Sequence, residues 1–482
     1  MNRSIRRLYL TMSGGFVVLV LLLGYWQVVA AGGLNDREGN LQAAQRERLI
    51  DRGRIISADG KILAASRARR IEGQRVFQRI YPQGSLAAHA TGYATIGNKT
   101  GLEDSYDRYL SGSFGTEPIL QRLNLSEKEG ADLHLSLDSR VQQVAAEGLA
   151  GARGAVVALD PRTGAVLAMA SSPTFDPGTV STDPQIFTQE GAPLVNRATA
   201  GRYPPGSTFK VVTATAALES DLGLTPSSSF DDTGSYATPG GPIRNFGGRD
   251  FGTHTLSTAL TNSINTTFAR LGDQLGPERL SDTMDAYGFG DRLPIDLPSA
   301  EVTISGRYEN GEPLPNADRG VDTARIAIGQ ERLLLTPLQM AMVAGAVANG
   351  GTLMAPQLMS RIEDRGGSVV RRARPVEIGQ VASAENAAAL TEMMGNVVRD
   401  GTGTAAALSS LGVDVAGKTG TAETGNTGLN QAWFIGFAPA EDSEVAVAVV
   451  IEGTSSTGGV VAAPIAARVM AAVVEPDSGE TP

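Results

Sequence analysis

The stretch GAVVALDPRTGAVLAMAS, residues 154–171, consists of two apolar runs joined by a turn that contains Asp160, Pro161 and Gly164. Short apolar runs bounded by turn residues are typical of paired β-strands, so this stretch predicts a β-hairpin. Three more strand candidates lie near the C-terminus, at 413–423, 431–439 and 444–453, and a helical pattern follows at 463–475. Five predicted strands therefore bracket a long middle section.

That middle section, from about 209 to 398, is dominated by helical patterns at 208–220, 260–276 and 336–350. The last two end at glycines suited to helix C-caps. Loops rich in Gly, Ser and Asp lie between them, near 225–253 and 300–320. The order of strands, helices and strands predicts an α+β fold, in which a five-stranded, mostly antiparallel sheet is covered by helices and carries an inserted all-helical lobe. A helical pattern at 139–149 opens this domain, which we expect to span 139–475.

The composition excludes several classes of protein. A chain of 482 residues is long enough for two or three domains, and a net charge of -10 argues against a nucleic-acid-binding surface. The chain has no cysteine, so disulfides and thiolate metal sites are excluded, and its only histidines are His89, His134 and His254. The usual thiol and imidazole partners of nucleophilic catalysis are therefore nearly absent.

The N-terminal segment predicts a membrane anchor. Arg3, Arg6 and Arg7 precede an uncharged run, residues 8–35, whose core FVVLVLLLGYWQVVAA is apolar enough to cross a bilayer. Arginines before the run place the N-terminus in the cytoplasm and everything after residue 35 outside. A cleaved signal peptide is the alternative, with small residues at 30–32 near a plausible cut, but its apolar region should be shorter.

Residues 36–138 are charged, rich in turns and poor in long apolar runs. RGRIISADGKILAAS, residues 52–66, reads as two short strands around an Asp59-Gly60 turn, and 101–112 resembles a short helix. We interpret this region as a small β-rich pedestal without catalytic residues. The last residues, 476–482, have the composition of a disordered tail.

YPPGSTFK, residues 203–210, places Ser207 and Lys210 three residues apart where a loop becomes a helix. Residues i and i+3 share a helix face, so the Lys210 amine can reach the Ser207 hydroxyl. Unpaired N–H groups at the helix start favour a developing negative charge. A serine at this place is more often a helix cap than a nucleophile, so the pair alone is weak evidence.

The use of lysine strengthens the functional interpretation. The chain has five lysines against 36 arginines, and after Glu129 the only two are Lys210 and Lys418. A buried lysine can lose its proton near neutral pH, whereas arginine cannot. Two neighbouring lysines would lower each other's pKa. The alternative is that a codon bias towards arginine left these two lysines in place by chance.

Two further motifs offer groups for acyl transfer. GKTGTAE, residues 417–423, places Lys418, Thr419 and Thr421 on a predicted strand, where they could bind a carboxylate. The missing side chain at Gly420 would let an extended peptide lie alongside, as in β-augmentation. NSIN, residues 262–265, supplies Ser263 to relay a proton and Asn265 to orient the lysine and a carbonyl, although such a motif on its own is more often a cap or turn.

Together, Ser207-x-x-Lys210, Ser263-x-Asn265 and Lys418-Thr-Gly resemble the three motifs of the penicillin-recognising serine transpeptidases. The resemblance covers the anchor, the pedestal and the catalytic region. The resemblance is strongest to the class B, monofunctional branch. Within that branch it is strongest to the actinobacterial proteins of the penicillin-binding protein A group.

The resemblance implies a peptidoglycan D,D-transpeptidase that acts in cell-wall synthesis and division and needs no cofactor or metal. Ser207 would attack the penultimate D-Ala of a stem peptide, with Lys210 as base and Ser263 and Asn265 as relay and positioning pair. Lys418, Thr419, Gly420 and Thr421 would form the substrate-carboxylate strand, and the N–H groups of Ser207 and Thr421 the oxyanion hole. β-Lactams would stall the acyl-enzyme.

The resemblance also bears on partners and alternatives. A hundred residues between anchor and catalytic domain cannot hold a glycosyltransferase, so we expect a multi-spanning membrane glycosyltransferase as partner. A β-lactamase is disfavoured because no deacylating-glutamate motif lies between Arg270 and Arg332. A D,D-carboxypeptidase remains open, and an idle penicillin-binding scaffold or sensor is the alternative outside enzymes.

Overall fold

The computed structural model describes residues 3–24, 47–71, 73–114, 129–316, 321–423 and 428–475. The expected tail, 476–482, and part of the expected anchor, 25–35, lie outside these residues.

A five-stranded antiparallel sheet forms the centre of the catalytic region, in the order β20-β21-β22-β7-β8. The predicted hairpin is confirmed as β7 (Gly154–Leu159) and β8 (Val166–Ser172). The three C-terminal strands are β20 (Ala416–Glu423), β21 (Asn430–Ala438) and β22 (Val445–Thr454). The chain thus returns to the same sheet after an excursion of more than 200 residues, and β20 lies at its edge.

Helices bury both faces of this sheet. Along β7, Val156 and Ala158 pack with α8 (Ser139–Gly148) and α16 (Ala463–Val474). The alternate residues Ala155 and Val157 belong to the core on the other face, against which α13 (Pro337–Ala348) packs. Two covered faces explain why the strands are continuous apolar runs rather than alternating ones.

Among the described residues, the inserted lobe contains helices at the three expected places, 208–220, 260–276 and 336–350, and three further α-helices. They are α9 (Lys210–Glu219), α10 (Leu256–Thr261), α11 (Asn265–Ala286), α12 (Thr323–Ile326), α13 and α14 (Ala384–Arg399). Gly276 interrupts α11 with a φ of 72°, and Gly350 follows the end of α13 with a φ of 60°. Both glycines therefore have a positive φ, which residues other than glycine rarely adopt.

The lobe is not all-helical, which corrects the expectation. Short strand pairs occupy the expected loops and neighbouring segments: β9 (Ser229–Asp232) with β12 (Gly252–Thr255), β10 (Ser235–Tyr236) with β11 (Ile243–Arg244), β13 (Gly306–Glu309) with β14 (Glu312–Leu314) and β15 (Leu333–Leu334), and β16 (Thr352–Met354) with β19 (Glu377–Gln380). Strands of two to four residues are too short to show a period of two in sequence.

A six-stranded sheet, in the order β18-β17-β6-β1-β2-β3, forms the pedestal. Its strands are β1 (Ile55–Ile56), β2 (Ile62–Ile71), β3 (Gln74–Ile80), β6 (Asp132–Leu135), β17 (Met359–Glu363) and β18 (Val369–Arg372). β1 and β2 enclose the predicted Asp59-Gly60 turn, where Gly60 has a φ of 83°. Because β17 and β18 come from the catalytic part of the sequence, the two regions share a sheet across the expected boundary at 138.

Smaller elements complete the molecule. The pedestal adds α4 (Ala88–Thr91), α5 (Gly101–Ser105), α6 (Asp107–Leu110) and the pair β4 (Ala94–Thr95) and β5 (Asn98–Lys99). The rest comprises α15 (Gly458–Val461) and the 3-10 helices η2 (Pro184–Phe187), η3 (Gly206–Phe209), η4 (Phe246–Gly248), η5 (Ser299–Glu301), η6 (Thr404–Ala406) and η7 (Ser409–Leu411).

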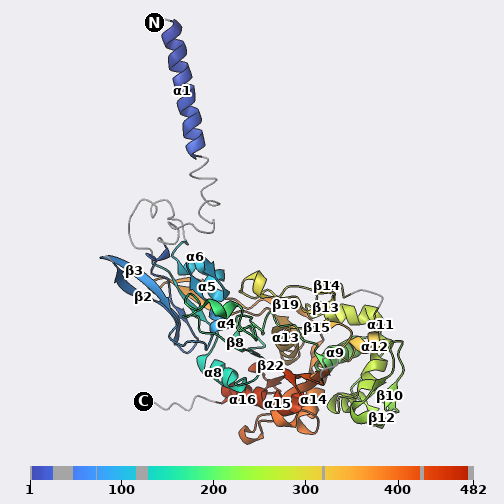
Figure 1. Cartoon of the computed structure of the whole chain (residues 1–482). Coiled ribbons are helices and arrows are strands. Elements are labelled where there is room, and N and C mark those ends of the chain that lie inside the picture. Colours follow the sequence, from blue (N-terminus) through green and yellow to red (C-terminus); the bar gives the residue numbers. More distant parts are fainter. Residues whose placement is uncertain are drawn as a thin grey trace.

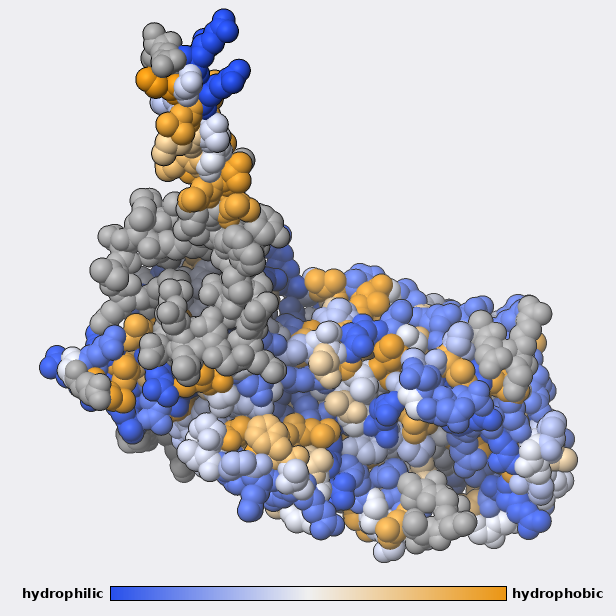
Figure 2. Space-filling view, turned by 45° about the horizontal axis from the view of Figure 1, so that its top comes forward, coloured by the Kyte–Doolittle hydropathy of each residue, from blue (hydrophilic) through white to orange (hydrophobic). Residues whose placement is uncertain are grey.

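The first helix, α1 (Arg3–Gly24), extends away from the rest of the molecule (Figure 1). Hydrophilic residues gather at its beginning and mostly hydrophobic ones follow (Figure 2). Its large apolar side chains, such as Phe16 and Leu22, are exposed. Among the helices of the described chain, none has both the length and the apolar character that a membrane span requires.

Candidate active site

The predicted nucleophile lies in a tightly held turn. Ser207 is on η3, which leads directly into α9, and its side chain is half-buried. Gly206 has a φ of 52° and its N–H donates to Gly329 O at 3.1 Å. On the other side, the buried Trp433 donates from Nε1 to Pro204 O at 3.0 Å. The turn is therefore fixed from both sides before any substrate binds.

The edge strand β20 packs against this turn, and Gly420 makes the close approach possible. A Cβ added at Gly420 would lie 2.8 Å from Pro205 O and 2.9 Å from Thr208 Cγ2. The sequence suggested that the missing side chain makes room for a bound peptide. In the structure that space belongs to the chain's own Ser207 turn, so Gly420 sets the distance between the turn and the strand.

Lys210 lies fully buried at the start of α9 and points to the NSIN segment. Its Nζ donates to Ser263 O at 2.7 Å and to Asn265 Oδ1 at 2.7 Å, and it lies 3.2 Å from Ser263 Oγ. The expected direct hydrogen bond with Ser207 is not formed, and within the described residues the Ser207 hydroxyl has no hydrogen-bond partner. The resting contacts of Lys210 are therefore with Ser263 and Asn265.

Lys418 reaches the same serine from the opposite side. Its Nζ donates to Ser263 Oγ at 3.0 Å and to Thr419 O at 2.8 Å, and the residue is fully buried. The two lysines, 208 positions apart, therefore share one hydroxyl group. All three predicted motifs meet at this point.

Burial determines the charge of the two amines. Loss of hydration lowers the pKa of Lys210 well below its usual value, and the neighbouring charge of Lys418 lowers it further. The Phe268 ring presents its face to this amine, with its centroid 5.4 Å from Lys210 Nζ. Loss of hydration lowers the pKa of Lys418 to about 7. Lys210 is thus the amine that is more readily neutral.

A neutral Lys210 fits its surroundings. An uncharged amine has two N–H donors and one lone pair, and Ser263 O and Asn265 Oδ1 can only accept. Once both donors are used, the lone pair is left to accept a proton from a hydroxyl group. Ser263 Oγ can donate to Lys210 while it accepts from a charged Lys418, which forms a continuous proton path between the amines.

The backbone around Ser263 and Asn265 is held in an unusual conformation. Ser263 has a φ of 57°, which is uncommon for a residue other than glycine. Asn265 begins α11, and its Nδ2 donates to Arg244 O at 2.9 Å, which turns Oδ1 towards Lys210. Strain of this kind persists where the surrounding structure holds it in place.

A buried polar network supports that segment. Asp232 accepts from Thr266 Oγ1 at 2.6 Å and from Asn245 Nδ2 at 2.7 Å, and Asn245 Oδ1 accepts from the Thr266 N–H at 3.1 Å. These hydrogen bonds lower the pKa of Asp232 although burial opposes them. Asn245 directly follows Arg244, so the network fixes the carbonyl that orients Asn265.

The two threonines of the KTGT segment are held by residues that the sequence did not indicate. Thr419 Oγ1 lies 2.5 Å from Thr402 Oγ1, in the loop after α14. Thr421 Oγ1 accepts from the Gly458 N–H at 3.3 Å, at the start of α15. Thr402 lies in a Gly/Thr-rich segment without a distinctive pattern, so nothing in the sequence alone pointed to it.

Comparison with protein families finds matches to two regions of the chain. Residues 154–471 match the model of the penicillin-binding protein transpeptidase domain. Residues 52–132 match the model of the penicillin-binding protein A dimerisation domain. The first match covers about two thirds of the chain and contains every predicted site residue.

Similar proteins cover almost the whole chain. The peptidoglycan D,D-transpeptidase PbpA of Mycolicibacterium smegmatis is 34% identical over 99% of this chain and 100% of its own length. Its counterpart in Mycobacterium tuberculosis is 33% identical over 98% of this chain and 99% of its own. The solved structure of penicillin-binding protein A from M. tuberculosis as a ceftriaxone acyl-enzyme superimposes with a TM-score of 0.79, at 31% identity, over 90% of this chain and 100% of that one. With this fold, these motifs and these relatives, the chain belongs to the penicillin-binding protein transpeptidases.

Proposed function

We propose that this chain is a peptidoglycan D,D-transpeptidase that cross-links stem peptides through an acyl-enzyme on Ser207. The observation that carries the proposal is the pair of buried lysines that share Ser263 Oγ behind the nucleophile turn. A lysine that serves only as a structural cation is expected to pair with a carboxylate when it is buried. A lysine that serves as a general base instead benefits from burial, because burial lowers the pKa of its amine.

In the first step, Ser207 Oγ attacks the carbonyl carbon of the penultimate D-Ala and passes its proton to neutral Lys210. The C–N bond to the terminal D-Ala breaks, and the leaving amine takes a proton that reaches it through Ser263. An ester on Ser207 remains. In the second step, the amine of another stem peptide attacks this ester, forms the cross-link and returns the proton to Ser207.

The edge strand β20 receives the substrate. No strand of the described residues pairs with its outer edge, so an extended peptide could add there, which would place the terminal carboxylate near Lys418, Thr419 and Thr421. The N–H groups of Ser207 and Thr421 act as the oxyanion hole. A donor of this kind contributes roughly 3–4 kcal/mol to the transition state of related acyl transfers. β-Lactams acylate Ser207 through the same contacts.

The test is covalent labelling of the full chain by a fluorescent penicillin. Ser207→Ala should abolish labelling, and Ser227→Ala, on an exposed loop outside the three motifs, should not change it. Persistent labelling of Ser207→Ala would place the nucleophile elsewhere.

A second measurement separates cross-linking from trimming. A stem-peptide substrate is incubated with an amine acceptor, and the products are identified by mass spectrometry. A cross-linked product supports the transpeptidase. Exclusive release of a shortened peptide would make the chain a D,D-carboxypeptidase instead.

The proposal includes a membrane location. The uncharged run 8–35 anchors the chain with its N-terminus in the cytoplasm, and the pedestal and catalytic region face outwards. Exposure of the apolar side chains of α1 supports this, because nothing in the described chain covers them. A multi-spanning glycosyltransferase in the same membrane supplies the glycan strands. Flotation of the full chain with vesicles tests the anchor.

A further inference from the structure

The pedestal hairpin formed by β2 and β3 concentrates positive charge in an acidic protein. Residues 62–80 contain five arginines and one glutamate, a net charge of +4 in a chain whose net charge is -10. None of the proposed catalytic groups lies there. A positively charged segment in a chain of negative net charge favours binding of an anionic partner at that segment.

Four of these five arginines are exposed, whereas the side chain of Arg79 is buried and paired with Glu103. Arg67, Arg69 and Arg70 are exposed, and none of them forms an ion pair within the described residues. Arg70 lies directly opposite Arg75 in the antiparallel register. The two strands therefore bring like charges together near the tip of the hairpin.

The tip of the hairpin is apolar as well as basic. Ile71 is 53% exposed and shares a face with Arg67 and Arg69, because alternate residues of a strand point the same way. Val76 lies opposite Arg69 on that face. An exposed isoleucine flanked by arginines suits a boundary between water and an apolar phase, where cationic heads stay in the polar layer.

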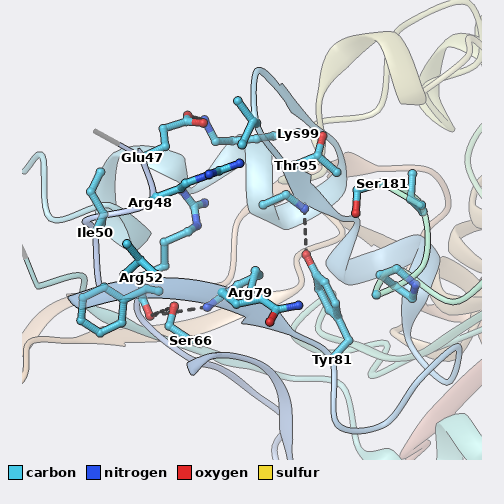
Figure 3. Close-up of a pocket in the computed structure, with 18 of the residues that line it drawn as sticks. Glu47, Arg48, Ile50, Arg52, Ser66, Arg79, Tyr81, Thr95, Lys99 and Ser181 are labelled. Carbon is cyan, nitrogen blue, oxygen red and sulfur yellow. Dashed lines mark hydrogen bonds and ion pairs between the residues drawn. The ribbon is translucent and has the colours of Figure 1, made fainter. Parts of the chain in front are cut away.

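A cavity of about 960 Å³ lies beside the hairpin (Figure 3). Its inner cations are already neutralised, since Arg52 and Arg79 contact Glu103 at 2.9 and 2.5 Å and Lys99 contacts Glu47 at 2.7 Å. Arg48 and Arg69, both exposed on its walls, form no ion pair with any residue that the structure describes. The surplus positive charge is therefore at the rim, which suits an extended anionic surface better than a small anion deep inside.

We propose that the β2–β3 hairpin and the cavity rim bind the anionic phospholipid headgroups of the membrane in which the chain is anchored. The inference rests on the anchor of the proposed function. Only 11 residues separate the end of the expected span from Glu47, which lines the cavity. Such a segment reaches at most about 40 Å, so the hairpin stays close to the bilayer. Headgroup binding would set the orientation of the catalytic region above it.

The experiment uses the absence of cysteine in the chain. Ile71→Cys gives a single site for an environment-sensitive fluorophore, and Ser227→Cys gives a matched site in the distant lobe. The full chain is reconstituted in vesicles of phosphatidylcholine alone or mixed with phosphatidylglycerol. We expect a blue shift of the Ile71→Cys label only with phosphatidylglycerol, reversed by high salt, and no shift of the Ser227→Cys label.

Charge-matched variants complete the test. Each arginine near an anionic surface strengthens binding about five-fold, so Arg67→Gln, Arg69→Gln and Arg70→Gln together should weaken the contact about 100-fold and abolish the shift. Arg371→Gln and Arg372→Gln in β18, at the opposite edge of the sheet, together with Arg374→Gln just after it, remove the same charge and should leave the shift unchanged. Equal shifts in both lipids, no shift in either, or a shift that survives loss of the hairpin arginines would overturn the inference.

Failure of this inference is distinguishable from failure of the proposed function. Flotation at high salt reports the anchor, and penicillin labelling reports Ser207, and neither depends on the hairpin arginines. Lack of a vesicle response in an anchored, labelled chain would point to an acidic protein as the partner and reject the lipid.

Discussion

At the scale of single residues, the amine of Lys210 lies between two carbonyl oxygens that can only accept hydrogen bonds. Lys210→Arg should therefore lower the rate of penicillin acylation by a factor of about 100 to 10,000, the range for loss of a general base. Arginine keeps the charge but cannot lose its proton. Stopped-flow acylation with a fluorescent penicillin measures the effect.

Two controls accompany this variant. Lys61→Arg changes an exposed lysine in the pedestal and should leave acylation unchanged. Because arginine is larger and position 210 is fully buried, the fluorescence of the buried Trp433 and circular dichroism must first establish that the variant is folded. Near-normal acylation by a folded Lys210→Arg would mean that Lys210 is a structural cation and not the general base.

Lys418 connects the site to stability. Its pKa of about 7 in the folded chain is below the value of about 10.4 in an unfolded one, so between these pH values the unfolded state binds more protons. The free energy of unfolding should therefore rise with pH from 7 to 10 and be lowest below pH 7. Each unit of pKa shift corresponds to about 1.4 kcal/mol. Lys418→Met should show a smaller rise.

Urea unfolding across this pH range, followed by tryptophan fluorescence, measures the slope. Lys61→Met, which removes an exposed lysine, should keep the slope of the unaltered chain. A slope unchanged in Lys418→Met would mean that this amine stays charged throughout.

The sequence revealed the lysines for a physical reason. After Glu129 the chain uses arginine almost everywhere, and its two lysines there are the two amines that the structure buries around Ser263. Thr402 gave no such signal, because a threonine that orients another hydroxyl is chemically like any surface threonine. Sequence reasoning therefore found the groups with unusual chemistry and missed those that hold them in place.

At the scale of elements, the approach of β20 to the nucleophile turn depends on Gly420. Gly420→Ala should move the turn by a fraction of an ångström to 1 Å, because the new Cβ would lie 2.8 Å from Pro205 O. A misplacement of this size can cost about 100-fold in rate. Acylation kinetics should show this loss while circular dichroism is unchanged.

Gly379→Ala is the matched control, since Gly379 lies in strand β19 and an added Cβ meets nothing within 4 Å. It should acylate normally. If Gly420→Ala also acylated normally, the turn and the strand would be free to adjust and the spacing would not be set by this glycine.

The elements that the sequence predicted are those with strong local signals. The strands buried on both faces, such as β7 and β22, are long apolar runs, and α8 and α13 have helical spacing or clear end signals. The pairs β10 with β11 and β13 with β14 were missed because their residues pair for only two or three positions. The role of Gly420 was misread because close packing between distant segments leaves no trace in local sequence.

At the scale of the whole molecule, the pedestal and the catalytic region are joined by shared structure. β17 pairs with β6 across more than 220 positions of sequence. A composition-based boundary at 138 could not anticipate this, because pairing between such distant strands is decided by the folded arrangement. The pedestal is thus completed by the region that it supports.

Asp296 holds this junction together. It accepts from Tyr106 Oη of the pedestal at 2.9 Å and from the N–H groups of Leu358 and Met359, at 2.7 and 2.8 Å, where β17 begins. Asp296→Ala leaves three donors unpaired and should lower the free energy of unfolding by about 1–3 kcal/mol. Thermal unfolding measures the loss, and Asp291→Ala, at an exposed aspartate nearby, should cause none.

Because Ser207 and both lysines are held by other contacts, the acylation rate of folded Asp296→Ala should be normal. A slower rate without loss of stability would instead mean that the junction transmits its geometry to the active site.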